Sequence, residues 1–173
     1  EKIKAYYINN APEKPTPPKQ MPIGKNLGRF NVVVPDYKLS PPSVTLVKIN
    51  DDKTIYIGDA NTQTFSVFSS DLKLVQPAKV NEGPVWAEEF PGQLLLTVMG
   101  SFAPTDVGTG YILGLSKTPG EPSGKVIDSL QRPVHSSYGD LDGDGLPDIV
   151  TCEFAKWTGK LAWWKNLGNG DFE

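Results

Sequence analysis

The sequence predicts an all-β fold, and three features of the 173-residue chain support this prediction. Short runs of β-branched and aromatic residues alternate with turns rich in Asp, Asn and Gly, which is typical of antiparallel meanders. The 17 Gly and 16 Pro disfavour long helices. The runs form sets that begin near Val44, Val85 and Val134, a period of about 40 to 50 residues that suits blades of four short strands. We therefore expect part of a β-propeller, with about three blade-like repeats of antiparallel strands.

The expected strands span residues 44–49, 54–57, 64–68, 84–88, 94–99, 111–115, 134–138, 149–152 and 160–164. They divide residues 43–173 into sets at about 43–83, 84–132 and 133–173. The polar segments Ser101–Gly110 and Lys117–Gly124 have the composition of surface loops. Propellers need at least about four blades to close a ring. We therefore expect either that further blades are missing here or that the strands build a sheet of another kind.

Residues 1–42 differ in composition, because they hold eight of the sixteen prolines. Proline removes a backbone donor and fixes φ, so this segment is expected to be an extended linker or strap. Residues 1–10 are compatible with a short helical stretch at the end of a preceding domain. The chain begins at Glu1 and ends in the turn-like segment Asp171–Glu173, so we expect it to be part of a longer polypeptide with a missing neighbouring domain or further blades.

The composition argues against several classes of function. A net charge of −3 gives no basic surface for nucleic acid. No apolar run approaches the roughly 18 residues that a membrane-spanning helix needs. Cys152 is the single cysteine, which excludes an intrachain disulfide.

The segment 140–148, Asp-Leu-Asp-Gly-Asp-Gly-Leu-Pro-Asp, predicts a calcium-binding loop between two strands. Calcium takes six to eight oxygen ligands, and carboxylates at alternate positions can curl around one ion. Gly143 and Gly145 permit the tight bends that such a loop requires. The predicted metal ligands are the carboxylates of Asp140, Asp142 and Asp144, the backbone carbonyl of Leu146, and the closing carboxylate of Asp148.

Three other interpretations of this segment fit its residues less well. An EF-hand loop also has Gly at its sixth position, here Gly145, but it ends with Glu at the twelfth position, where this chain has Thr151, and helices flank it. A solvated acidic turn would leave four carboxylates repelling one another without a cation. Magnesium prefers stricter octahedral geometry and keeps its waters. A calcium ion in a short loop closed by Asp148 is therefore the preferred interpretation.

The segment Tyr138–Val150 resembles the calcium-loop signature of FG-GAP and VCBS repeats, which are the blades of integrin-α-like β-propellers. Leu161–Phe172 resembles the end of such a repeat, a strand followed by Asn-x-Gly-x-Gly-x-Phe. The resemblance covers Val134–Glu173 and implies one calcium site in the chain. The equivalent positions of the earlier sets, Asn50–Lys53 and Glu88–Gln93, lack alternating carboxylates.

Histidine and cysteine give no catalytic motif. His135 is the only histidine, and no Gly-x-Ser-x-Gly elbow accompanies it, so a structural role is preferred. Cys152 follows a β run and is expected to be a small buried core residue.

One acidic pair and one aromatic pair are further candidates for function. Glu88 and Glu89 are neighbours in an expected strand, so they should point to opposite faces and not form a glycosidase pair by themselves. Trp163 and Trp164 should also alternate, one filling the interface between blades and the other more exposed. An exposed Trp, including Trp157, can stack on a sugar, although core packing is the commoner role.

The sequence therefore predicts a calcium-binding β-propeller module of an exported protein, secreted, periplasmic or at the cell surface. It is expected to be a non-enzymatic binding or scaffold unit for a carbohydrate or protein ligand. The alternative is a portion of a larger polysaccharide-degrading or redox enzyme. The resemblance further implies that a c-type cytochrome domain can precede such a module, although this chain has no Cys-x-x-Cys-His haem motif.

Overall fold

The computed structural model describes residues 43–117 and 124–173, all of which belong to the compact unit Val34–Glu173. The predictions for residues 1–42 and for most of the second polar segment lie outside the described residues. The strands are β1 (Val44–Ile49), β2 (Ile55–Asp59), β3 (Thr64–Phe68), β4 (Leu74–Lys79), β5 (Pro84–Phe90), β6 (Gln93–Val98), β7 (Gly110–Ser116), β8 (Gly124–Leu130), β9 (Pro133–Gly139), β10 (Asp148–Phe154) and β11 (Gly159–Trp164). The described residues contain no helix, which confirms the all-β prediction.

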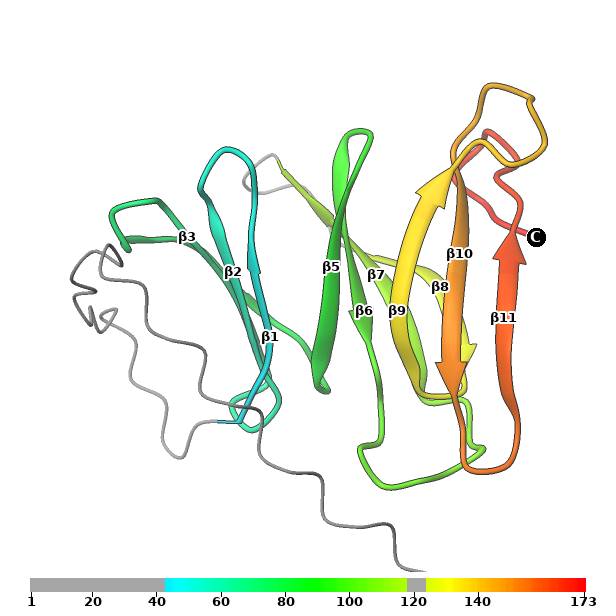
Figure 1. The fold of residues 1–173 in the computed structure, drawn as a ribbon, viewed down its shortest axis with the longest axis horizontal. Coiled ribbons are helices and arrows are strands. Elements are labelled where there is room, and N and C mark those ends of the chain that lie inside the picture. The colour runs from blue at the N-terminus through cyan, green and yellow to red at the C-terminus, as the bar shows by residue number, and fades with distance from the viewer. Residues whose placement is uncertain (1–42, 118–123) are drawn as a thin grey trace, which may run out of the picture. The chain divides into compact units, whose positions relative to one another are not determined.

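The strands form three antiparallel sheets, each a meander of consecutive strands (Figure 1). Sheet 1 has the order β1-β2-β3-β4, sheet 2 the order β5-β6-β7-β8, and sheet 3 the order β9-β10-β11. The first strands, β1, β5 and β9, run along neighbouring sheet edges, and β5 contacts both of the others. The strands of each predicted set therefore lie together in one sheet.

The strand predictions missed β4 and β8, the fourth strands of sheets 1 and 2. Both are edge strands with few buried side chains, and β4 contains Pro77. A proline is tolerated at an edge because its missing N–H is not needed by a second neighbour. Exposure and proline together remove the apolar alternation by which a strand is recognised in a sequence.

The sheets are held together through their faces by two hydrophobic clusters. The first joins sheet 1 to sheet 2 through buried side chains that include Leu46, Tyr56, Phe65, Leu94 and Leu96. The second joins sheet 2 to sheet 3 and is built from Phe90, Leu95, Ile112, Ile127, Leu130 and Ile149, with Trp164 and Phe172 against it. Sheet 2 is therefore covered by apolar side chains on both faces.

Two glycines allow the sheets to approach closely. A Cβ on Gly58 of β2 would lie 2.8 Å from Pro84 Cγ at the start of β5. A Cβ on Gly110 of β7 would lie 2.2 Å from Pro133 Cδ at the start of β9. Each following sheet thus begins with a proline that packs against a glycine of the sheet before it, and a larger residue at either glycine would push the two sheets apart.

Polar contacts between the sheets add specificity to this packing. Thr97 of β6 and Ser136 of β9 share a hydrogen bond of 2.7 Å between fully buried hydroxyls. At the other junction, Lys48 donates from Nζ to the carbonyl of Ala87 at 2.9 Å. A shifted register would leave the buried hydroxyls and the half-buried Lys48 ammonium without these partners, so the contacts favour one alignment of the sheets.

Replacing Phe65 by alanine tests the importance of the sheet 1–sheet 2 cluster. The side chain is 1 % exposed, so Phe65→Ala should lower the free energy of unfolding by about 3–5 kcal/mol through lost burial and a cavity. Val107→Ala, at a side chain that is 62 % exposed, should change it by less than about 0.5 kcal/mol. Urea denaturation measures both, and equal effects would contradict the assigned core.

Candidate metal centre

The Asp-rich loop joins the first two strands of sheet 3, β9 and β10, as the sequence predicts (Figure 1). The equivalent connections in sheets 1 and 2 are the short turns between β1 and β2 and between β5 and β6. Only the sheet 3 connection carries alternating carboxylates among the described residues. The loop has strands on both sides, which excludes an EF-hand here.

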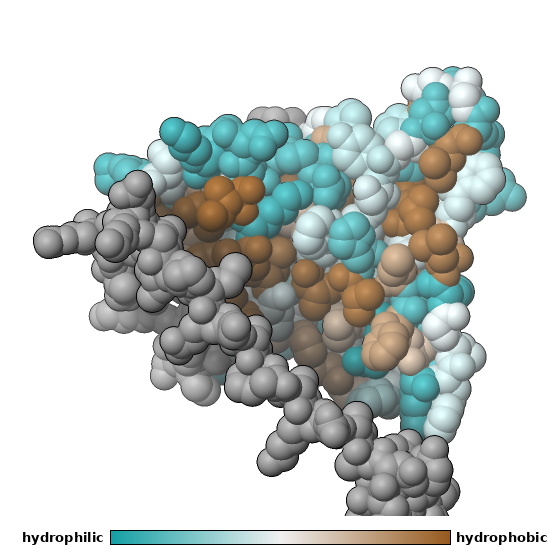
Figure 2. Space-filling view, in the orientation of Figure 1, coloured by the Kyte–Doolittle hydropathy of each residue, from teal (hydrophilic) through white to brown (hydrophobic). Residues whose placement is uncertain are grey.

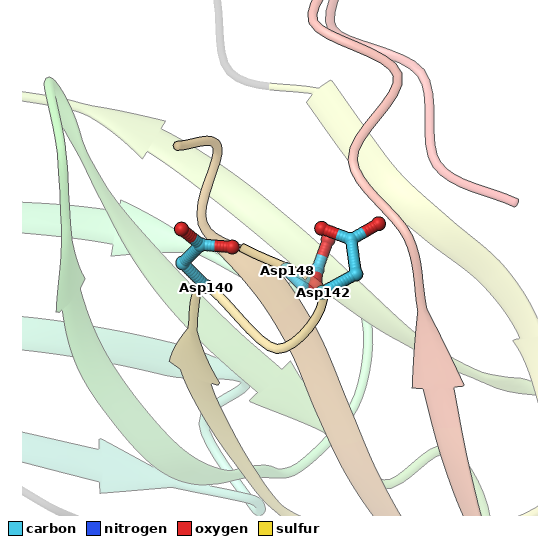
Figure 3. A group of neighbouring side chains, drawn as sticks. All are labelled: Asp140, Asp142 and Asp148. Atoms are coloured by element: carbon cyan, nitrogen blue, oxygen red, sulfur yellow. The ribbon is translucent and has the colours of Figure 1, made fainter. Parts of the chain in front are cut away.

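The loop brings three of the predicted carboxylates together. Oxygens of Asp140, Asp142 and Asp148 all lie within 4.8 Å of one another (Figure 3). Asp140 and Asp142 are exposed parts of the loop, whereas Asp148 starts β10 and is fully buried. Three carboxylates converging at this separation form a cluster that one hard cation can bridge.

Backbone amides hold the carboxylates in place. Asp140 accepts hydrogen bonds from the N–H of Gly143 at 2.8 Å and of Gly145 at 3.0 Å, which curls the chain around its side chain. Gly143 and Gly145 have φ of +79° and +86°, the left-handed region that glycine adopts without strain. Asp142 and Asp144 each accept from the N–H two residues on, at 3.2 and 2.9 Å.

Asp148 is the anchor of the loop. Its Oδ2 accepts the N–H of Leu141 at 3.1 Å, and its Oδ1 accepts the N–H of Asn166 at 2.8 Å. Asn166 also donates from Nδ2 to the carbonyl of Pro147 at 2.9 Å. One buried carboxylate thus ties the start of the loop to the segment that follows β11.

Lys165 supplies a positive charge to the cluster. Its Nζ pairs with Asp142 Oδ2 and lies 3.3 Å from Asp144 Oδ2. The ammonium lowers the pKa of Asp142, and the two carboxylates raise the pKa of Lys165. Lys165 therefore partly offsets the repulsion expected among the loop carboxylates. The sequence pattern did not predict a role for this lysine.

The other predicted ligands are placed differently. Asp144 is outside the group of three converging carboxylates and faces Lys165 instead. Leu146 donates its N–H to Asp144 Oδ1 and is half-buried. The five-residue ligand set, including these two positions, stays a prediction.

His135 and Trp86 stack at the junction of sheets 2 and 3. Their ring centroids are 4.2 Å apart, and Lys48 Nζ lies 5.0 Å from the Trp86 ring. Trp86 donates from Nε1 to Glu88 at 3.1 Å. These contacts give the single histidine a packing role.

Cys152 is exposed, so the prediction of a buried core cysteine is wrong. It pairs with Leu161 across the strands on the face of sheet 3 that points away from sheet 2. The alternation predicted for the tryptophans is confirmed, because Trp164 packs against the core and Trp163 is 52 % exposed. Trp157 is 79 % exposed.

A cleft of about 630 Å³ lies between sheets 1 and 2 and is lined by both Glu88 and Glu89. The neighbouring glutamates take different partners, as expected for adjacent strand positions: Glu88 pairs with Lys48 at 3.2 Å, and Glu89 pairs with Lys117 and accepts the Tyr56 hydroxyl. Tyr56, Phe65 and Leu94 also line the cleft. Each glutamate is thus paired with a lysine and accepts a hydrogen bond from an aromatic side chain, Trp86 for Glu88 and Tyr56 for Glu89.

Comparisons with protein-family models, with curated proteins and with solved structures found no match. No helix in the described ranges is long and apolar enough to cross a lipid bilayer. The interpretation of the loop therefore depends on its own geometry and on the resemblance of its residues.

Acid titration tests the anchoring role of Asp148. Its pKa is lowered, first by the N–H of Asn166 and then by that of Leu141, against the opposing effect of burial. A depressed carboxyl pKa contributes stability above the unfolded value of about 3.9, and this stability is lost as the pH falls through the folded pKa. Wild type should therefore exceed Asp148→Asn in stability at pH 6, with the gap closing below about pH 4.

Urea midpoints measured across this pH range provide the check. Asp51→Asn is a suitable control, because Asp51 is an exposed carboxylate in the turn between β1 and β2, remote from the loop. A gap between wild type and Asp148→Asn that persists unchanged at pH 2 would contradict the anchoring role.

Proposed function

We propose that this chain is a calcium-binding portion of a β-propeller that acts as a binding or scaffold module. The observation that carries the proposal is the convergence of Asp140, Asp142 and Asp148 on a loop between two strands of one sheet. Carboxylate oxygens in this number suit calcium, whereas a zinc site would require nitrogen or sulfur ligands. The ion would bridge the exposed loop to the buried start of β10.

The propeller architecture is supported by the repetition of the sheets. Three consecutive meanders pack face to face, and the first strand of each contacts the first strand of the next. Propeller blades are sheets of four antiparallel strands arranged radially about a central channel, and successive blades pack face to face. The resemblance of residues 134–173 to FG-GAP and VCBS repeats is in keeping with this architecture, and an exported location would supply enough calcium to saturate even a weak site.

The cleft between sheets 1 and 2 is our candidate for the ligand site of the module. It offers lysine and tyrosine donors and glutamate acceptors above an apolar floor, the mixture that binding sites use to fix orientation. Its carboxylates are engaged with lysines rather than with each other, which argues against a pair acting as glycosidase acid and base. A non-catalytic role with a carbohydrate or protein ligand therefore fits better than the enzyme alternative.

Calcium titration tests the metal site directly. One calcium ion per chain should bind in isothermal titration calorimetry, and calcium at 100 times its dissociation constant should raise the free energy of unfolding by about 2.7 kcal/mol. Asp142→Asn should weaken binding, because the change removes a carboxylate charge without changing its size. Asp128→Asn should leave binding unchanged. The absence of both bound calcium and a chelator effect on the melting temperature would refute the site.

Replacing Lys165 tests whether its ammonium competes with calcium for the loop carboxylates. Two unit charges about 4 Å apart interact by about 1 kcal/mol in water, so Lys165→Met should tighten calcium binding about fivefold at low salt. Without calcium the same variant should melt at a lower temperature, because the carboxylates lose their internal counter-charge. Calorimetry and thermal melting measure the two effects. An unchanged calcium affinity would show that Lys165 does not compete for the site.

A further inference from the structure

The cleft between sheets 1 and 2 has more acidic than basic groups on its walls. Four carboxylates and two lysines line it, so it carries two excess negative charges at neutral pH. These groups are Asp51, Asp52, Glu88, Glu89, Lys48 and Lys117. The β1–β2 turn at the rim is covered by hydrophilic residues, which are teal along the upper edge of sheet 1 in Figure 2. A ligand that enters the cleft therefore meets a negative potential.

Carboxylate oxygens of the cleft remain available to a ligand. Glu88 is contacted only at Oε2, by Lys48 and by Trp86 Nε1, so its Oε1 accepts no hydrogen bond from a described residue. Asp51 is exposed and forms no ion pair with any residue in the described ranges. The unused hydrogen-bonding capacity of these side chains is that of an acceptor.

The lysine and tyrosine donors of the cleft, by contrast, already have protein acceptors. Lys48 Nζ donates to Glu88 at 3.2 Å. Lys117 pairs with Glu89, to which the Tyr56 hydroxyl also donates. The complementary ligand is therefore one that donates hydrogen bonds, and a cationic donor also offsets the excess negative charge.

The apolar floor of the cleft adds a second requirement. Phe65, Leu94 and Leu115 belong to the cluster that joins sheets 1 and 2, and Val67 packs against this cluster. A lysine or arginine side chain packs its methylene stem on apolar surface and keeps its charged end at a polar rim. An acidic rim above an apolar floor matches both parts of such a side chain.

The same walls suit a carbohydrate less well. A sugar ring stacks on an open aromatic face, but the two aromatic side chains among the described lining, Tyr56 and Phe65, are 6 % and 1 % exposed. A neutral sugar would leave the excess charge unbalanced, and an acidic polysaccharide would be repelled by it. Of the two ligand classes considered for the module, a protein is therefore favoured.

We propose that the cleft between sheets 1 and 2 binds a basic segment of a partner protein, which inserts a lysine or arginine side chain toward Glu88 and Asp51. The inference rests on the proposed ligand-binding role of this cleft and narrows its ligand to a cationic polypeptide. Each ion pair formed at this partly exposed rim is weak by itself. Recognition therefore uses several basic residues and depends on ionic strength.

Fluorescence anisotropy with a labelled hexalysine peptide tests the proposal on the full 173-residue chain in calcium-containing buffer. Labelled hexaglutamate and maltohexaose are the acidic and neutral comparison probes. Of the three probes, only hexalysine should bind. Raising sodium chloride from about 50 to about 500 mM should weaken its binding about tenfold, because the Debye length falls about threefold over this range.

Two cleft variants and two control variants locate the binding site. Glu88→Gln and Asp51→Asn each remove one carboxylate at nearly constant volume and should each weaken hexalysine binding about fivefold. Asp128→Asn in β8 and Asp142→Asn in the Asp-rich loop remove carboxylates outside the cleft and should leave this binding unchanged. Circular dichroism checks folding. If Glu88→Gln fails to fold, the exposed Asp51 still provides the test.

The outcomes that overturn the inference also separate it from the proposed ligand site. Hexalysine binding that is equal in wild type and all four variants, or that is lost only in Asp142→Asn, would place the peptide outside the cleft. Maltohexaose binding that Glu88→Gln weakens, without hexalysine binding, would retain the cleft as a ligand site and replace the basic ligand with a carbohydrate. If no probe binds, both the basic ligand and the ligand-binding role of the cleft are refuted.

Discussion

Each sheet of this protein presents apolar side chains on both faces, and this constraint determines the rest of the arrangement. A sheet with two apolar faces cannot remain isolated in water, because it would expose most of the surface whose burial drives folding. Stacking the sheets face to face covers both sides of sheet 2 with two separate clusters. The glycine–proline contacts at the two junctions then fix how closely successive sheets approach.

The Asp-rich loop is connected to this packing through Asp148. The residue combines a buried position with two backbone donors, one from the loop and one from the segment after β11. The exposed carboxylates of Asp140 and Asp142 therefore stand on a fixed base, although the loop itself lies at the surface. A cation held by all three would stiffen a connection that the hydrophobic core does not reach. Lys165 provides part of the same electrostatic compensation from within the chain.

The Asp-rich loop and most strands could be predicted from the sequence, because they depend on residues that are close together in the chain. Alternating Asp residues with Gly143 and Gly145 dictate a curled loop, and β-branched runs predicted nine of the eleven described strands. The edge strands β4 and β8 escaped prediction because a largely exposed strand shows no apolar periodicity. The burial of Cys152 was predicted wrongly, because a residue in an apolar strand can lie on either face of its sheet. Which face is buried depends on the neighbouring sheet, and the strand's own sequence does not reveal it. The role of Lys165 depends on its contact with Asp142, which lies 23 residues earlier in the sequence. Local sequence patterns do not reveal a contact between residues that far apart.

The consecutive order of strands within every sheet also affects how the chain is made. Each sheet is assembled from one continuous stretch, so its pairings close short loops and lose little chain entropy. During synthesis the first sheet can pair its strands before the residues of the third have left the ribosome. By contrast, the hydrogen bond from the Asn166 N–H to Asp148 Oδ1 can form only after Asn166 has left the ribosome. The Asp-rich loop is therefore expected to become ordered late in biosynthesis, after the two sheets that precede it are in place.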